Sequence, residues 1–139
     1  MKSKLICGGI LALAASFGAS ANPTERCIGA LAAEPSLQPL AGKVALGRTG
    51  EVIALRVSDR TASEQERAVV TVWLQKRNEC FDLGASYRRT SVTPQEIAFL
   101  RSVFVFEQRL LAGLQGGRLT YTEFNRQRLE LAQAAGQEI

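Results

Sequence analysis

The stretch GGRLTYTEFNRQRLELA, residues 116–132, predicts a helical hairpin near the end of this 139-residue chain. Its two glycines end one helical segment, because a glycine just past a helix readily takes the left-handed conformation that closes the last turn. Thr120 then begins a second segment, with Glu123 placed three residues later as in a capping box. So short a connection makes the two helices antiparallel neighbours, over residues 94–135.

The hairpin also predicts which of its residues face one another. If the chain folds back between residues 117 and 118, facing positions sum to 235. One of these pairs is charged, Glu107 with Arg128, and each member interrupts the apolar stripe of its helix. We predict a buried ion pair that fixes the register, because losing one partner costs about 3–5 kcal/mol whereas replacing both can be neutral. The alternative is an Arg128 that lies along the stripe and reaches water. The remaining pairs are apolar: Leu114–Tyr121, Leu111–Phe124, Phe104–Leu131 and Leu100–Ala135.

The same helix-start signal occurs four times and predicts an all-α protein. In each case Asn, Ser or Thr is followed three residues later by Glu, and in two cases Pro occupies the first helical position. The expected fold is a small bundle of about four helices. These would cover about 23–33, 64–84, 94–115 and the residues from 121 on. Between the first two helices, residues 35–60 would form a loop-rich connection with one or two helical turns, in which 52–57 could be a short helix or a strand.

Residues 1–21 read as a secretory signal peptide. Two lysines precede an apolar run, and the segment ends in Ala19-Ser20-Ala21. The run is shorter than the roughly 20 apolar residues that span a bilayer. We therefore expect cleavage after Ala21, no transmembrane segment in the mature chain, and a periplasmic or secreted protein with one helical domain, residues 22–139. Loss of Lys2 and Lys4 would leave 15 basic residues against 13 acidic ones, a net charge of +2.

Two cysteines would remain in the mature chain, Cys27 and Cys80. In an exported protein such a pair most simply forms one disulfide. The loop between them is long enough for the bond to contribute about 4 kcal/mol by the chain-entropy model. The bond would join the first helix to the late turns of the second.

The third helical segment carries apolar side chains on all sides. A helix of this kind lies at the centre of a bundle or at an interface with another protein. In a domain with four helices, the neighbours would leave part of its circumference for a partner protein or for a second copy. The predicted interaction surface consists of Phe99, Val103, Phe106, Leu110, Tyr121 and Phe124.

Little in the sequence points to catalysis or to a cofactor. The chain has no histidine, which removes the commonest general base and the histidine metal sites, and we expect neither metal nor cofactor. A carboxylate pair such as Glu79 with Asp82 is more often a solvated helix face than an acid/base dyad.

A candidate basic patch is too small for nucleic acid, which needs a long basic face. Its members are Arg88, Arg89, Arg118 and Arg126. The alternative is that Arg88 and Arg89 lie in a solvated loop after the second helix.

Residues 117–128 resemble the C-terminal hairpin of small exported proteobacterial proteins, which read G-[KR]-[LI]-T-Y-x-E-[FY]-N-R-x-R. The segment Trp73–Cys80, with the pattern W-L-x-x-R-x-x-C, is also similar to those proteins. That group has no settled activity, so the resemblance implies an exported compartment and a helical architecture but no catalytic role.

These observations favour an exported protein that is not an enzyme and works by binding. We expect an interaction module or inhibitor that engages another protein of the cell envelope through an apolar helical surface. The alternative is a structural homo-oligomer that uses the same surface. A small hydrolase with a carboxylate pair is a third reading, and it would require a pocket that holds a strongly perturbed Asp or Glu.

Overall fold

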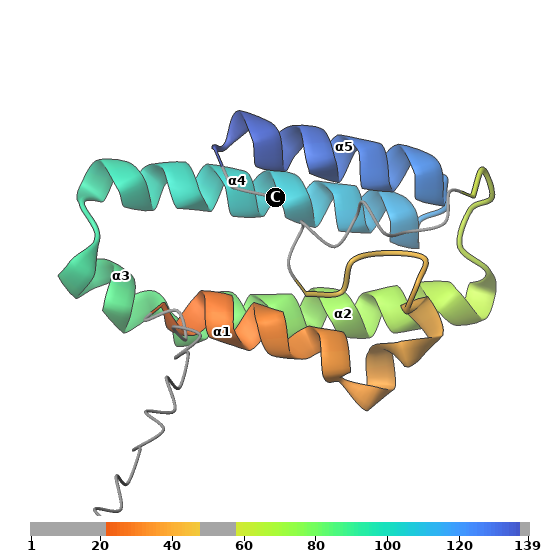
Figure 1. Ribbon diagram of the computed structural model, residues 1–139, viewed down its shortest axis with the longest axis horizontal. Coiled ribbons are helices and arrows are strands. Elements are labelled where there is room, and N and C mark those ends of the chain that lie inside the picture. Colours follow the sequence, from red (N-terminus) through yellow and green to blue (C-terminus); the bar gives the residue numbers. More distant parts are fainter. Residues whose placement is uncertain (1–21, 48–57, 137–139) are drawn as a thin grey trace, which may run out of the picture.

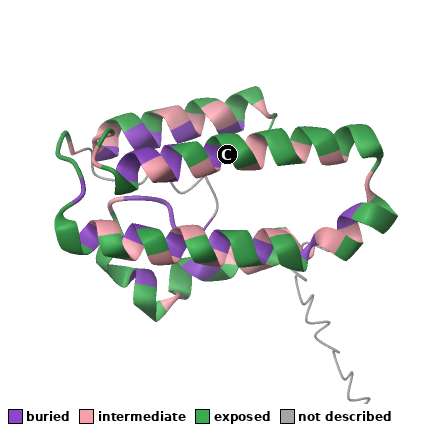
Figure 2. Cartoon of the chain, turned by 180° about the vertical axis from the view of Figure 1, so that it is seen from behind, coloured by how far each residue is buried: buried purple, intermediate pink, exposed green. Residues whose placement is uncertain are grey.

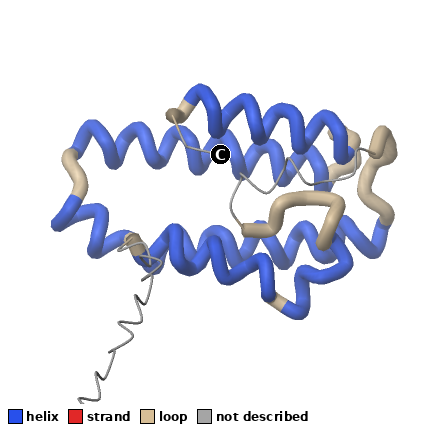
Figure 3. The backbone as a smooth tube through the Cα atoms, viewed as in Figure 1, coloured by secondary structure: helices blue, strands red, loops and turns tan. Residues whose placement is uncertain are grey.

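The chain folds as an all-α bundle, which confirms the predicted fold class (Figure 1). The computed structural model describes residues 22–47 and 58–136, and over these residues it contains helices and no strand (Figure 3). The expected signal peptide and the ambiguous segment 52–57 lie outside the described residues. In chain order the elements are α1 (Pro23–Ala30), the 3-10 helices η1 (Leu31–Ala33) and η2 (Pro35–Leu40), α2 (Glu64–Leu83), α3 (Ala85–Ser91), α4 (Pro94–Gln115) and α5 (Tyr121–Ala134).

Four of the helices begin at the capping residue that the sequence indicated. The N-caps of α1, α2, α4 and α5 are Asn22, Ser63, Thr93 and Thr120, and each side chain accepts a backbone N–H of the first turn. The backbone N–H groups of Thr93 and Thr120 also donate to the carboxylates of Glu96 and Glu123, so two complete capping boxes form. At Ser63 only the first bond forms, because the carboxylate of Glu66 is buried in other contacts.

The hydrophobic core lies between α2, α4, α5 and the chain that leads from η2 to Gly47. Trp73 of α2 is fully buried and meets Phe124 of α5 edge to face, with ring centroids 6.0 Å apart. Its indole Nε1 donates to the carbonyl of Leu46 at 3.2 Å. The connection before α2 therefore has its own place in the core. It contributes Leu37, Leu40, Val44, Ala45 and Leu46, all buried.

Helix α3 corrects the expectation of a loop after α2. The chain passes through Gly84, where an added Cβ would lie only 2.0 Å from Thr24 Oγ1, so the end of α2 can approach α1 this closely only with glycine. Arg88 of α3 then donates to Thr24 Oγ1 at 3.1 Å, and its guanidinium lies 3.7 Å from the centroid of the Phe81 ring. These contacts fold α3 back onto α1 and α2.

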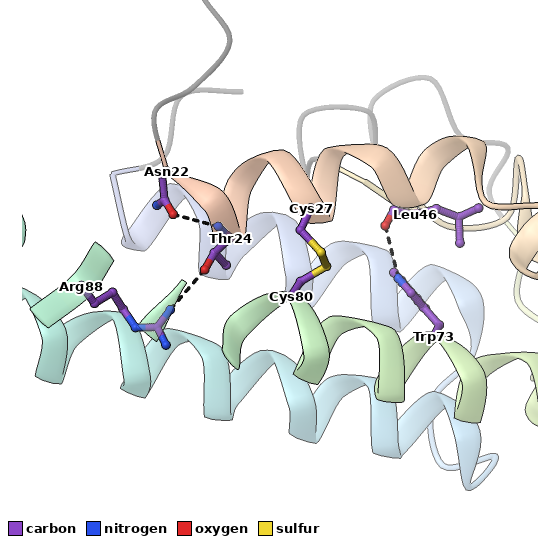
Figure 4. Close-up of a disulfide and its surroundings, with 7 residues drawn as sticks. All are labelled: Asn22, Thr24, Cys27, Leu46, Trp73, Cys80 and Arg88. Carbon is purple, nitrogen blue, oxygen red and sulfur yellow. Dashed lines mark hydrogen bonds between the residues drawn. A yellow bond between two sulfur atoms is a disulfide. The ribbon is translucent and has the colours of Figure 1, made fainter. Parts of the chain in front are cut away.

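The Cys27–Cys80 disulfide joins α1 to α2 as the sequence predicted, with the two Cα atoms 5.3 Å apart (Figure 4). None of the residues of α1 is fully buried, although Cys27 and Ile28 pack against the core. The attachment of α1 therefore depends strongly on the disulfide. Figure 4 also shows the Arg88–Thr24 bond, which holds the beginning of the same helix.

Helix α4 has two halves with different surroundings. It contains 22 residues whereas its hairpin partner α5 contains 14, so α5 lies along only the later part of α4 (Figure 1). We call residues 107–115 the covered half and residues 94–106 the open half. Every buried residue of α4 belongs to the covered half (Figure 2). Within the described part of the chain, neither α4 nor any other helix has the length and apolar character needed to cross a membrane.

Candidate interaction surface on helix α4

The covered half holds a cluster of three buried charges. Arg128 of α5, which is 1 % exposed, donates from Nε to Glu107 Oε1 at 2.7 Å. Its two terminal nitrogens donate to the backbone carbonyls of Ala45 and Gly47. Arg77 of α2 donates to the other carboxylate oxygen of Glu107. The structure thus brings the predicted pair together and adds a third member, so we call Arg77, Glu107 and Arg128 the buried ion cluster.

The surroundings of the buried ion cluster keep Glu107 and Arg77 charged. Burial raises the pKa of Glu107, but the neighbouring Arg77 and Arg128 outweigh it and hold the pKa below its ordinary range. Burial lowers the pKa of Arg77 to about 10, which leaves the guanidinium protonated at neutral pH. Both guanidinium groups also lie close to Trp73, at 5.9 Å for Arg77 and 5.2 Å for Arg128 from a ring centroid. The cluster ties α2, α4 and α5 together at one level of the bundle.

The reasoning that predicted a buried role for Arg128 could also have predicted one for Arg77. It lies four residues after Trp73 and three before Cys80, so it interrupts the buried stripe of α2 just as Arg128 interrupts that of α5. An arginine in the middle of a core-facing stripe indicates a buried carboxylate on a neighbouring helix. The sequence offered Glu107 for that role.

A second buried carboxylate, Glu66, lies in the first turn of α2. Arg60 donates to both of its oxygens, at 2.7 and 3.2 Å, and the Tyr121 hydroxyl donates at 2.7 Å. Lys43 lies 3.4 Å away. Burial raises the pKa of Glu66, but these hydrogen bonds and positive charges prevail and set it at about 2. The carboxylate is therefore ionised at neutral pH, and it links the starts of α2 and α5.

Three of the six residues of the predicted apolar surface are buried in the fold. Leu110, Tyr121 and Phe124 are buried in the core, which corrects their assignment to an interaction surface. The cause is the packing of the hairpin, in which Phe124 of α5 meets Trp73 and the Tyr121 hydroxyl meets Glu66, both on α2. Val103 is half-buried. Only Phe99 and Phe106 are available to a partner.

Three large apolar side chains are exposed on the open half of α4. Phe99 is 50 % exposed, Val105 48 % and Phe106 46 %. Val105 was missing from the predicted surface, because an apolar pattern on every side of a helix does not tell which side the neighbours leave uncovered. A shallow hollow runs along this side of the helix. It is lined by Arg101, Ser102, Val105, Phe106 and Arg109. We call these five residues and Phe99 the α4 open face.

The polar groups of the α4 open face differ in their bonding. Ser102 donates its hydroxyl to the carbonyl of Ala98 at 3.0 Å, so its hydrogen is used within the helix. Arg101 and Arg109 are exposed, and neither has an ion-pair partner within residues 22–47 and 58–136. The face thus combines apolar contact area with two positive charges, both available to a partner.

The four arginines of the predicted basic patch do not form one surface. Arg88 is buried against Phe81 and Thr24, which corrects its assignment to a solvated loop. Arg89 precedes α4 and Arg118 follows it, so a helix about 33 Å long separates them. Arg126 pairs with Glu130 on α5 at 2.9 Å. The candidate carboxylate pair is exposed on α2, where Glu79 accepts a hydrogen bond from Gln75.

Comparisons of the chain with protein-family models, curated proteins and solved structures give no match. The described residues contain no group of three His, Cys, Asp or Glu side chains that could hold a metal ion. The case for a function therefore rests on the α4 open face and its surroundings.

Proposed function

We propose that this protein is an exported helical module that binds another protein of the cell envelope through the α4 open face. The observation that carries the proposal is the half-exposed state of Phe99, Val105 and Phe106 on a helix whose other half contains all of its buried residues. Aromatic residues and arginine are enriched in protein interfaces and supply most binding hot spots. The α4 open face has both residue types within two turns of one helix.

Export is the second part of the proposal. It is supported by the signal-like residues 1–21 and by the Cys27–Cys80 disulfide, a bond that persists in oxidising compartments. The resemblance of the hairpin motif, residues 117–128, to small exported proteins also supports export.

Binding rather than catalysis is the third part. The two buried carboxylates, Glu66 and Glu107, are engaged by arginine inside the bundle. Side chains in such contacts fix the positions of helices. The exposed pair Glu79 and Asp82, on which a hydrolase would depend, lies on a solvated side of α2.

Photo-cross-linking in the cell tests the proposal. A photoreactive amino acid is placed at Phe106 on the α4 open face, and as the matched control at Gln133, an exposed position of α5. We expect a recurring cross-link to a foreign envelope protein from Phe106 and none from Gln133. The double substitution V105E/F106E should abolish partner capture by a tagged protein, whereas Q133E should leave it unchanged.

Two results would contradict the proposal. A cross-linking pattern that is the same at Phe106 and Gln133 would remove the α4 open face as a binding surface. Cross-links from Phe106 to other copies of the same chain, and to nothing else, would favour a structural homo-oligomer.

A further inference from the structure

The two arginines of the α4 open face lie at either end of its hollow. Arg101 and Arg109 are eight residues apart in one helix, which places them two turns and about 12 Å apart along its axis. Val105 lies midway between them, and Phe106 lies beside it. Both guanidinium groups are exposed and have no acidic partner in the described residues. An apolar centre with a positive charge on each side sets the chemistry of what can bind.

We propose that the α4 open face takes an acidic amphipathic helix of a partner protein. This inference rests on the proposed binding function and adds the chemical class of the partner. Its carboxylates, spaced two turns apart, would pair with Arg101 and Arg109, while apolar side chains between them pack on Val105 and Phe106. The guanidinium fork suits carboxylates, with which it forms paired hydrogen bonds.

The shape of the face suits a helix. Ala98 and Ser102 are small residues that lie one turn apart on this side of α4, and both are exposed. The Ser102 hydroxyl bonds back to the Ala98 carbonyl, so its donor hydrogen does not require a partner. Small side chains beside larger ones leave a groove into which the ridge of a second helix packs.

A second copy of the chain fits the face less well. If two α4 helices packed antiparallel across Val105, positions that sum to 210 would face one another. Arg101 would then face Arg109 of the second copy at both ends of the contact. Like charges across an interface act against the pairing. The charge pattern therefore favours a different, acidic protein over self-association.

Two synthetic helical peptides of equal length test the proposal on the purified, oxidised protein. Both carry leucines in the middle turn. One has glutamate and the other lysine, two turns apart on the same side. By fluorescence anisotropy at low salt we expect the acidic peptide to bind about tenfold more tightly than the basic one, as two surface ion pairs allow. At about 0.5 M NaCl this preference should largely disappear.

Charge reversal supplies the matched control. The variant R101E/R109E should reverse the preference, whereas R89E/R118E changes the net charge equally at exposed sites off the face and should keep it. Equal binding of the two peptides, or equal effects of the two variants, would overturn the acidic-helix proposal. If capture in cells still depended on Val105 and Phe106 in that case, the proposed binding function would stand without it.

Self-association is the remaining outcome. Sedimentation of the purified protein should show one mass across concentrations, and R101E/R109E should leave it unchanged. A mass that rises with concentration, and rises further in the single variant R101E, which would place opposite charges at the facing positions 101 and 109, would overturn the proposal in favour of a second copy as the occupant.

Discussion

The two halves of α4 have similar apolar sequences and opposite environments. The open half contains Phe99, Val105 and Phe106, all about half exposed, whereas the covered half contains Leu110, Leu111 and Leu114, all buried. The difference comes from the neighbours, because α5 ends at Ala134 and lies along the later part of α4 only. An apolar helix is thus half core and half surface, and the length of its neighbour sets the boundary.

Charge also differs between the buried and the exposed side of α4, although Arg109, which by number belongs to the covered half, lies on the exposed side. In the covered half Glu107 is surrounded by Arg77 and Arg128, and every charge of this group has an opposite partner. In the open half Arg101 has no ion-pair partner in the described part of the chain. We interpret the buried ion cluster as a structural feature that holds the helices together. We interpret the unpaired arginine as a group that can bind a partner. The predictions below test this division.

The largest effect is expected from breaking the buried ion cluster. Arg128→Met leaves Glu107 with one of its two arginines and leaves the carbonyls of Ala45 and Gly47 without their donor. We expect a loss of about 3–5 kcal/mol in the free energy of unfolding, measured by urea denaturation. Arg101→Met in the open half should stay within about 0.5 kcal/mol of the parent. Equal losses from the two substitutions would contradict the division.

A matched pair of apolar truncations sharpens the comparison. Leu110 and Phe106 are one turn apart on α4, yet Leu110 is buried and Phe106 is about half exposed. Leu110→Ala should cost about 2–5 kcal/mol, because it removes buried contacts and leaves a cavity. Phe106→Ala should cost less than 1 kcal/mol, roughly, since its ring contacts water for much of its area. Thermal and urea unfolding of both variants would show whether the order is reversed.

Acid titration distinguishes two carboxylates of the same helix. Burial raises the pKa of Glu107 but the two arginines lower it below its ordinary value of 4.5, whereas the pKa of Glu96 is lowered by the backbone N–H of Thr93. A folded-state pKa below the unfolded one contributes stability above pH 4.5 that is lost as the pH falls further. The stability gap between the parent and Glu107→Gln should therefore shrink below pH 4.5.

The corresponding gap for Glu96→Gln should be smaller at every pH, because Glu96 is exposed and makes only a capping contact. Unfolding free energies measured between pH 3 and 7, roughly, would check both curves. A gap for Glu107→Gln that grows as the pH falls would contradict the assignment of its two arginine partners.

The sequence predicted the parts of this molecule that local rules govern. Capping residues located the starts of four helices, and the short Gly116–Thr120 connection gave the register that places Arg128 against Glu107. The disulfide followed from the cysteine count. Each of these features depends on neighbouring residues or on one simple pairing.

The rest depends on contacts between distant segments. Arg77 meets Glu107 across thirty positions of sequence, and the buried state of Arg88 depends on Thr24 and Phe81. Val105 is exposed because no described helix covers this side of α4. The residues next to Val105 in the sequence do not indicate which side the other helices cover. The sequence could therefore indicate exposed apolar side chains on α4, but not the side of the helix on which they lie.

Hydroxyl-radical footprinting tests the binding surface most directly, because it reports coverage without knowledge of the partner. The protein is labelled in isolated cell envelopes and as a dilute purified sample, and side-chain oxidation is compared residue by residue. We predict that Phe99 and Phe106 are strongly oxidised in the purified protein and protected in the envelope, while Trp73 and Phe124 are protected in both. Equal oxidation of Phe106 in the two samples would contradict the account.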